Sequence, residues 1–308
     1  MNSPSNAMPE SLDSQRVAPA VLSETRPLYW SVRRELWENR WVSLGPLVAG
    51  GIFLFGYLIS LFGLPHRMSE ISALNPAQQH SAILAPYDMA AGLLMLTQIL
   101  VGVFYCLDAF QGERRDRSIL FWKSLPVSDL TTVLAKASIP FVILPLVTVA
   151  VTVFAQLVIL LLSTFVLLAS GHSVAFLWAH VPWLQISWAV FYHIVTVHTL
   201  LYAPFYGWLL LVSAWARRAA YLWAFFPVLA ITFLEKIIFS TSYVANMLLS
   251  RLTGGMESVA PADRMPIDPM THFTPLKFLG SAELWIGLGL TAAFLAVAVR
   301  LRRYRDPI

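Results

Sequence analysis

Long runs without ionisable residues dominate the chain, and short polar or charged stretches separate them. Six runs are long enough for an α-helix to cross a bilayer, which takes about 20 apolar residues. We expect these spans at about 42–62, 89–110, 139–169, 186–214, 221–234 and 284–299. Hydrocarbon offers the backbone no hydrogen-bond partners, so each run should be helical, and the runs are too continuous for barrel strands. The pattern predicts an all-α polytopic membrane protein with six transmembrane helices.

The composition agrees with this prediction. The chain has 308 residues, of which 57% are hydrophobic and 12% are charged, whereas soluble domains have about 45–50% apolar and about 25% charged residues. Lipid accepts apolar side chains on every face of a helix, which explains the excess. The only cysteine is Cys106, so no disulfide can form within the chain. We find no signal peptide and expect the first span to act as an uncleaved anchor.

The basic residues indicate which side of the membrane each loop faces, because lysine and arginine are enriched in cytoplasmic loops. With the N-terminus inside, most of the 21 basic residues fall on the inner side. The outer segments hold only Arg67, Arg251, Arg264 and Lys277, and Lys236 lies at a span end. An even number of spans then places both termini in the cytoplasm.

Residues 1–27 form a polar cytoplasmic tail, and residues 28–41 have the pattern of an amphipathic helix in the inner membrane interface. On an α-helix, Trp30, Trp37 and Trp41 would lie within about 40° of one another. Most charged residues lie elsewhere, but Arg34 falls on the tryptophan side and would have to snorkel. The alternative is an ordinary aromatic belt with basic anchors. Both interpretations place the tryptophans in contact with membrane lipid.

A second amphipathic stretch follows the fifth span. Apolar residues recur at helical spacing between Ile237 and Leu252, with polar residues between them, which predicts an outer helical segment between spans five and six. Glu235 and Lys236 precede this stretch. Charges near a membrane are candidates for function, but a position near the outer rim also suits interfacial anchoring. The loop continues through two glycines and a proline-rich stretch.

The most strongly charged stretch lies between the second and third spans. Gln111–Ser118 reads Gln-Gly-Glu-Arg-Arg-Asp-Arg-Ser, and burying each charge at mid-bilayer would cost about 2.5–3.5 kcal/mol. We therefore expect solvated side chains here, with Gly112 breaking the second helix. Ile119–Trp122 would then present a compact apolar group. That group is either a protein-docking surface, for which aromatic and arginine residues are typical, or a loop dipped into lipid headgroups. We call residues 111–128 the charged segment.

The charged segment resembles a known motif. Glu-Arg-x-Asp at 113–116 is followed by Ser-Ile-Leu-Phe-Trp-Lys-Ser-Leu-Pro-Val-Ser at 118–128 and by Lys136. This is similar to the coupling region of type-2 ATP-binding-cassette permeases. Those permeases have an interfacial N-terminal helix, six spans, a cytoplasmic coupling helix between spans two and three, and an outer helical hairpin between spans five and six. The chain has each predicted feature in the same order, although Arg117-Ser118 replaces the family's frequent Gly-Thr.

The resemblance implies a function and its partners. Residues 42–308 would be the permease domain of an ATP-driven exporter in a bacterial inner membrane, working as a homodimer or with a sibling permease. Cytoplasmic ATPase subunits would dock on residues 113–128 of the charged segment and move it when they bind ATP. Polar contacts would come from Glu113, Arg114 and Arg117, and a wedge from Phe121 and Trp122. The implied coupling residues are Glu113, Arg114, Arg115, Asp116, Arg117, Ile119, Leu120, Phe121 and Trp122.

Motifs for catalytic chemistry are missing from the sequence. There is no Gly-x-x-x-x-Gly-Lys-Ser/Thr phosphate loop, so ATP and magnesium would be bound by the partner subunit. There is no His-Glu-x-x-His or Gly-x-Ser-x-Gly motif either, and nothing near His172 and His180 completes a metal site. We therefore predict no catalytic residue, metal or cofactor in this chain, and no nucleic-acid partner.

A polar stripe runs along the third span. Thr148, Thr152 and Gln156 are spaced four residues apart and share one helix face, and Gln98 in the second span is a candidate neighbour. Polar side chains of this kind commonly hydrogen-bond between membrane helices. Alternatively, the stripe lines a substrate pathway or the seam of a dimer.

Three alternative functions remain: a mechanotransmission subunit, a membrane-embedded enzyme and a secondary transporter. A mechanotransmission subunit would use the same ATPase but act on a periplasmic partner without moving a substrate, through an outer segment at about 240–283. A membrane-embedded lipid-processing enzyme would need clustered acidic or histidine residues, and arginines surround the nearest candidates, Asp108, Glu113 and Asp116. A secondary transporter would normally carry more spans and inverted repeats.

Overall fold

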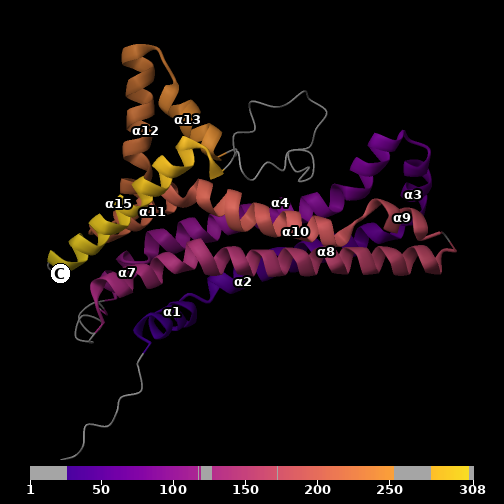
Figure 1. Ribbon diagram of the computed structural model, residues 1–308, viewed down its shortest axis with the longest axis horizontal. Helices are drawn as coiled ribbons and strands as arrows, with labels where there is room; N and C mark the ends of the chain where they lie inside the picture. Colours follow the sequence, from indigo (N-terminus) through magenta and orange to yellow (C-terminus); the bar gives the residue numbers. More distant parts are fainter. Residues whose placement is uncertain (1–25, 117, 119–126, 172, 253–278, 305–308) are drawn as a thin grey trace, which may run out of the picture.

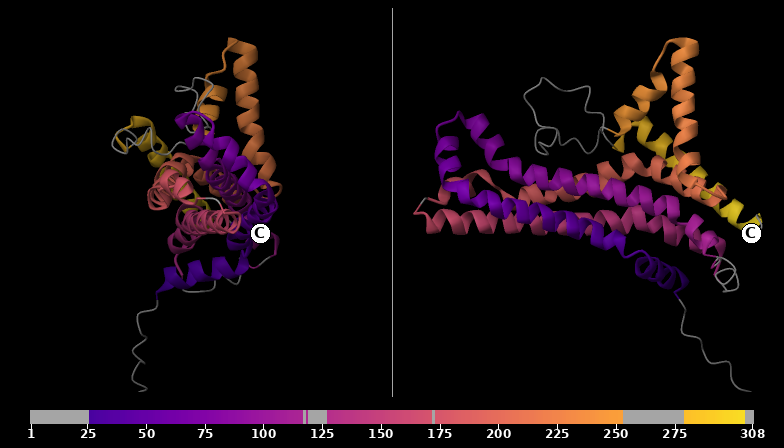
Figure 2. Two further views of the ribbon diagram at one scale, coloured as in Figure 1. Left: turned by 90° about the vertical axis from the view of Figure 1, so that its right-hand side faces the viewer. Right: turned by 180° about the vertical axis from the view of Figure 1, so that it is seen from behind.

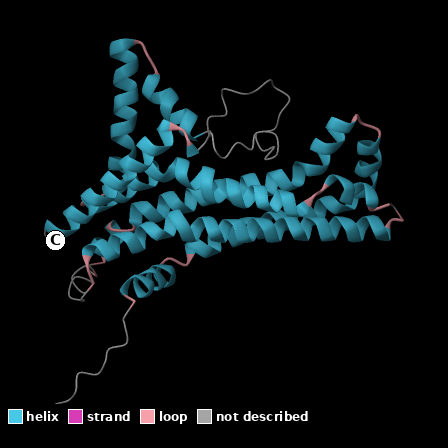
Figure 3. Ribbon diagram, in the orientation of Figure 1, coloured by secondary structure: helices cyan, strands magenta, loops and turns pink. Residues whose placement is uncertain are grey.

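The computed structural model describes residues 26–116, 118, 127–171, 173–252 and 279–304. Every regular element within these ranges is a helix (Figure 3), and six helical stretches are long and apolar enough to cross a membrane. The predicted all-α fold of a multi-pass membrane protein is confirmed. The six stretches are Trp41–Ser72, Pro76–Arg115, Asp129–Ala169, Ala175–Trp215, Ala220–Phe239 and Ala282–Tyr304.

The long helices lie side by side in an elongated bundle (Figure 1). Helix α2 (Trp41–Ser60) packs on α4 (Pro76–Asp108) and α8 (Leu144–Ala169), and α4 also packs on α11 (Thr199–Trp215). Buried apolar side chains form one cluster around Tyr105 and Tyr206 and a second around Tyr87. The bundle therefore has a separate core toward each of its two ends.

Short helices close the two ends of the bundle. At one end, α3 (Leu64–Ser72) follows a 3₁₀ turn at Leu61–Gly63 and lies near α9 (Ala175–His180). At the other end, three short helices lie near the C-terminal end of α15 (Ala282–Tyr304) (Figure 2). They are α1 (Pro27–Glu38), α5 (Gln111–Arg115) and α7 (Asp129–Ser138). This second end contains the described part of the charged segment.

Several helices differ in length from the sequence prediction. Helix α4 begins at Pro76 rather than near residue 89, because the Asn75 side chain accepts a hydrogen bond from the Gln78 amide at 2.9 Å and Pro76 suits the first helical turn. Polar residues therefore extend the second span at its N-terminal end. Helix α1 ends at Glu38, so Trp41 belongs to α2 and not to the predicted interfacial helix.

Two of the spans contain a turn of π-helix. One turn, η2 (Ile139–Ile143), joins α7 to α8 and includes Pro140. The other, η3 (His193–His198), joins α10 (Trp183–Tyr192) to α11. A π turn has wider hydrogen-bond spacing than an α-helix. Spans three and four therefore run on without a break, but the side chains before and after each π turn do not follow one regular α-helical spacing.

Helix α12 (Ala220–Phe239) leaves the bundle at a steep angle, and α13 (Tyr243–Leu252) turns back from its far end (Figure 1). Ala219 and Ser240, the residues on either side of α12, have φ angles of 51° and 52°. These left-handed residues redirect the chain before and after α12. The predicted amphipathic stretch from residue 237 to 252 is thus split between two helices. Only Ala220 and Ala224 of α12 are buried.

Candidate functional site

The described part of the charged segment begins inside the protein rather than in water. Helix α5 starts at Gln111, after a two-residue turn that follows α4, and Glu113 on its first turn is only 7% exposed. The prediction that residues 113–117 are all solvated is therefore wrong for Glu113, because neighbouring cations replace the water. Gly112 lies within α5 rather than breaking a helix, and a Cβ there would come within 2.9 Å of the Asp108 carboxylate.

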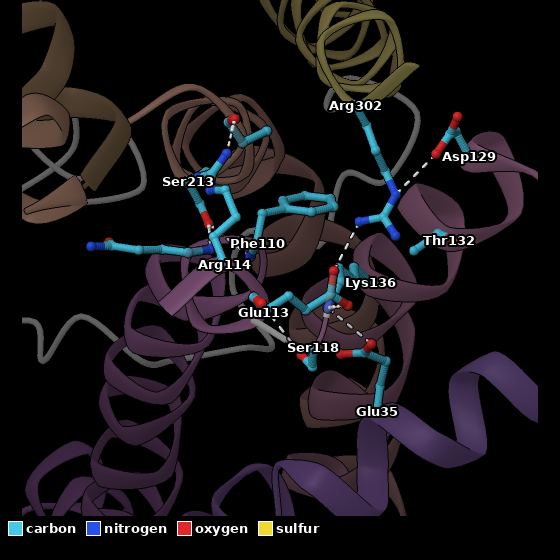
Figure 4. Close-up of polar contacts among 12 residues, drawn as sticks. Glu35, Phe110, Glu113, Arg114, Ser118, Asp129, Thr132, Lys136, Ser213 and Arg302 are labelled. Carbon is cyan, nitrogen blue, oxygen red and sulfur yellow. Dashed lines mark hydrogen bonds and ion pairs between the residues drawn. The ribbon is translucent and has the colours of Figure 1, made fainter. Parts of the chain in front are cut away.

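Three cations from three different helices surround the Glu113 carboxylate, and Figure 4 shows two of them, Lys136 and Arg302. Its Oε1 lies 3.2 Å from Arg34 Nη2 of α1 and 3.1 Å from Lys136 Nζ of α7. Its Oε2 lies 2.9 Å from Arg302 Nη1 of α15. A single side chain at the start of the charged segment therefore connects α1, α7 and α15.

A second buried carboxylate, Glu35 of α1, completes the cluster. Its Oε1 lies 2.9 Å from Lys136 Nζ and 2.6 Å from Arg34 Nη2, and its Oε2 accepts a hydrogen bond from the Tyr105 hydroxyl at 3.0 Å. Arg302 also pairs with Asp129 of α7, at 3.1 Å. This ion-pair cluster comprises Arg34, Glu35, Glu113, Asp129, Lys136 and Arg302, which are three cations and three carboxylates. Arg34 also lies 3.6 Å from the carboxylate of Glu38, which is exposed.

The electrostatics of the cluster favour the charged form of Arg34. Burial disfavours the charge on Arg34, but the carboxylates of Glu35, Glu38 and Glu113 outweigh burial and raise the pKa of the guanidinium above its ordinary value. The ring of Phe110, itself buried, lies 5.4 Å from Lys136 Nζ and 5.9 Å from the guanidinium carbon of Arg302. These cation–π contacts give the two cations a further partner in place of water.

Arg114 connects the segment to another helix. Its guanidinium donates hydrogen bonds to the carbonyl oxygens of Ser213, Ala214 and Ala216, the last two at 2.6 and 2.8 Å. These carbonyls lie at the C-terminus of α11, where the helix dipole favours a positive charge. The Ser213 hydroxyl in turn accepts from the backbone amide of Phe110 at 2.9 Å.

The segment also reaches the start of α12. The Gln111 side-chain oxygen accepts a hydrogen bond from the Ala220 amide at 3.1 Å, which caps the first turn of that helix. Trp208 of α11 donates to the Ala224 carbonyl at 3.1 Å, one turn further along α12. Helix α12 is thus held at its first turns by α5 and α11, while most of its later side chains are exposed.

The remaining residues of the predicted coupling set fall into two groups. Arg115 and Asp116 are exposed, and Arg115 lies 3.5 Å from Asp108 and 3.4 Å from Asp116. The predicted apolar group and Arg117 lie outside the described residues; they are Arg117, Ile119, Leu120, Phe121 and Trp122. Ser118 is described, and its hydroxyl donates to the Glu113 carbonyl at 3.3 Å.

The tryptophans of the N-terminal region are exposed, as the interfacial prediction requires. Trp30, Trp37 and Trp41 are 56%, 67% and 76% exposed, and the Arg33 guanidinium lies over the Trp30 and Trp37 rings at 5.4 and 4.8 Å. Arg34 does not snorkel along this face; it turns inward to Glu35 and Glu113 because the buried carboxylates attract it.

The polar stripe lies inside the bundle. Gln98, Thr148, Thr152 and Gln156 are at most 1% exposed, so in this conformation they form no surface that a second copy could touch. Thr148 and Thr152 donate to carbonyls of their own helix at 2.9 and 2.7 Å rather than to a neighbouring helix. Both side-chain amide atoms of Gln98 and the Gln156 oxygen have no hydrogen-bond partner among the described residues. A role in a substrate pathway stays a prediction.

Sequence reasoning named only Glu113 of the ion-pair cluster as a site residue and missed the other five. Arg34 was expected only to snorkel, Lys136 was the last residue of the motif, and no site role was expected for Glu35, Asp129 or Arg302. The available signal was a charge inside or beside an apolar helix, which is costly unless it is paired. In the described part of the chain, no group of three or more histidine, cysteine, aspartate or glutamate residues lies close enough to hold a metal ion.

Comparison with known proteins adds no identification. No protein-family model matches the chain, and no curated protein matches it either.

Proposed function

We propose that the chain is the permease subunit of an ATP-driven exporter of the type-2 ATP-binding-cassette kind, in a bacterial inner membrane with both termini in the cytoplasm. Two permease chains would work together, and a separate cytoplasmic ATPase would dock on the charged segment and hydrolyse ATP. The observation that carries this proposal is the position of Glu113. It lies at the start of the proposed docking segment and is ion-paired to α1, α7 and α15.

This arrangement is suited to passing a movement of the charged segment on to the helices that are paired with it. A buried ion pair is costly to break, by about 3–5 kcal/mol when one partner is lost, so the segment and the paired helices should move as one body. Arg114 extends that body to α11 through hydrogen bonds to the helix C-terminus. A loop that merely anchored the chain in headgroups would not need buried bonds to four helices.

The proposal makes a direct prediction about the ATPase. Phe121→Ala with Trp122→Ala should abolish co-purification of the co-expressed ATPase, because these residues would provide the apolar wedge, while the chain still inserts into the membrane. The matched control is Trp285→Ala with Ile286→Ala, which removes two neighbouring apolar side chains that are 63% and 69% exposed at the other end of α15. Full co-purification with the Phe121/Trp122 variant would refute the docking assignment.

A mechanotransmission role is the second candidate, and the course of α12 favours it. This helix is anchored at its first turns and otherwise leaves the bundle, and α13 turns back from its far end to meet α11 (Figure 2). A projecting hairpin on the outer side would be suited to holding a periplasmic partner. Photo-crosslinking from Tyr243, which is 76% exposed, would capture such a partner. Stimulation of ATP hydrolysis by an added amphipathic substrate, without any captured protein, would favour export instead.

A further inference from the structure

A groove of about 490 Å³ lies between α2, α3 and α4, toward the end of the bundle opposite the ion-pair cluster. This volume falls within the usual range for small-molecule sites, about 300–1,000 Å³. The walls are mostly apolar, and their side chains include Ile52, Phe53, Met68, Ile83 and Met89. The outward face of α2 beside the groove is also apolar, with Ile52 67% and Phe55 66% exposed. The groove is therefore open to the region where lipid would contact the protein.

Two polar groups mark the groove as a site rather than a packing gap. The Tyr87 side chain lines it and is 1% exposed, yet its hydroxyl has no hydrogen-bond partner among the described residues. An unpaired buried hydroxyl costs about 1–3 kcal/mol, so a ligand atom that pairs with it would be favoured. The neighbouring Tyr57 hydroxyl is already satisfied by Ser163 at 2.6 Å.

The second polar group is Arg67 of α3, at the rim. It donates to the Ser60 carbonyl, and no carboxylate lies within ion-pair distance of it in the part of the chain that the structure describes. The nearest acidic residue along α3, Glu70, is paired with His66 at 3.2 Å. An exposed arginine beside an apolar groove is suited to bind an anionic group, because its guanidinium matches phosphate oxygens geometrically.

We propose that this groove binds one anionic phospholipid of the outer leaflet. An acyl chain would lie against the apolar walls, the phosphate would pair with Arg67, and an ester oxygen would accept a hydrogen bond from the Tyr87 hydroxyl. The assignment to the outer leaflet rests on the membrane orientation of the proposed function, because Arg67 follows the first span. The binding chemistry itself requires no ATPase, so it can be tested on the purified chain alone.

Glycine positions on α2 provide a matched pair of variants. Gly56 lines the groove and Gly51 lies one and a half turns earlier, and a Cβ at either position would meet no atom within 4 Å. Gly56→Trp should fill the groove without disturbing the fold, and Gly51→Trp should add the same side chain elsewhere. The full chain is placed in vesicles of phosphatidylcholine with a trace of phosphatidylglycerol that carries a photoreactive acyl chain. Cross-linked peptides are then mapped by mass spectrometry.

We expect labelling of α2 and α4 at the groove-lining residues, reduced at least about fivefold in Gly56→Trp and unchanged in Gly51→Trp. Arg67→Gln should reduce it about two- to fivefold, as for loss of an exposed ion pair, whereas Lys236→Gln should not. Photoreactive phosphatidylcholine should label the groove more weakly. If Gly56→Trp is labelled as strongly as the unsubstituted chain, or if labels are spread uniformly around α2, the cross-links come from ordinary surrounding lipid. Either result would overturn the proposed site. Equal labelling by both lipids with no effect of Arg67→Gln would overturn its anionic selectivity.

Discussion

Lys136 of α7 and Glu35 of α1 form an ion pair of 2.9 Å between two side chains that are 2% and 1% exposed. The same ammonium group lies 3.1 Å from Glu113 at the start of the charged segment. Electrostatic interactions are stronger in a low-dielectric interior than in water, and an unpaired charge there is correspondingly costly. Lys136 is therefore the point at which α1, α5 and α7 depend on one another.

Replacing Lys136 with methionine should remove one of the two cations that Glu35 and Glu113 share and leave only Arg34 between them. We expect a loss of about 3–5 kcal/mol in unfolding free energy, measured by denaturant unfolding of the purified chain in detergent. Arg115→Met serves as the control because that side chain is 65% exposed, and we expect a change of about 1 kcal/mol or less. If the Lys136→Met protein is as stable to unfolding as the control, the buried ion pairs do not hold α1, α5 and α7 together.

The contact between Glu113 and Arg302 joins residues that are 189 positions apart in the chain. A double-mutant cycle with Glu113→Gln and Arg302→Gln should give a coupling energy of about 1–3 kcal/mol, since the two groups touch and share partners. The exposed pair of Arg115 and Asp116 provides a reference cycle, for which we expect about 0.5 kcal/mol or less. Additive effects at Glu113 and Arg302 would argue against a direct connection between the charged segment and α15.

The close approach of α4 and α11 depends on Gly102. A Cβ at this position would come within 2.7 Å of the Tyr206 ring, which is completely buried and cannot move aside. We expect Gly102→Ala to destabilise the protein by about 1–3 kcal/mol through overpacking. Gly51→Ala meets open space and should be neutral or slightly stabilising, because alanine favours a helix. Thermal unfolding of both variants tests this, and equal melting temperatures would contradict the packing described here.

Glu235 attaches α13 to the end of α12. Its carboxylate accepts hydrogen bonds from the Tyr243 and Val244 amides at 2.6 and 2.9 Å and from the Thr241 hydroxyl at 3.0 Å. Glu235→Gln should weaken this cap, so hydrogen exchange in the first turn of α13 should become faster. Lys236→Gln, which changes the exposed neighbour, should leave the exchange unchanged. Equal exchange in both variants would mean that the carboxylate does not hold α13.

The sequence pattern was sufficient for the spans but not for their ends. Continuous apolar runs predict six helices because lipid selects for them, and the predicted start of the first span, residue 42, differs by one residue from the start of α2 at Trp41. The early start of α4 at Pro76 follows from a capping asparagine and a helix-starting proline. Those signals were present in the sequence, but a search for continuous apolar runs does not detect capping residues.

Sequence reasoning missed the ion-pair cluster for a different reason. The insertion cost of a charge applies to hydrocarbon, and it led to the expectation that Glu113 is solvated. In the protein, cations from α1, α7 and α15 replace the water, and such long-range pairing leaves no local periodicity. The steep course of α12 was hidden as well, because Ala219 and Ser240 are not residues that usually mark a left-handed conformation.

The central claim, that an ATPase docks on the charged segment at the cytoplasmic face, is tested most directly by site-specific cross-linking from Asp116. This residue is exposed, and the natural Cys106 is fully buried, so Asp116→Cys provides the only accessible thiol for a photoreactive maleimide. We predict that a membrane-impermeant thiol reagent labels it only from the cytoplasmic side, and that illumination links it to a co-expressed ATP-binding subunit. Labelling from the periplasmic side, or cross-links to lipid alone, would contradict the account.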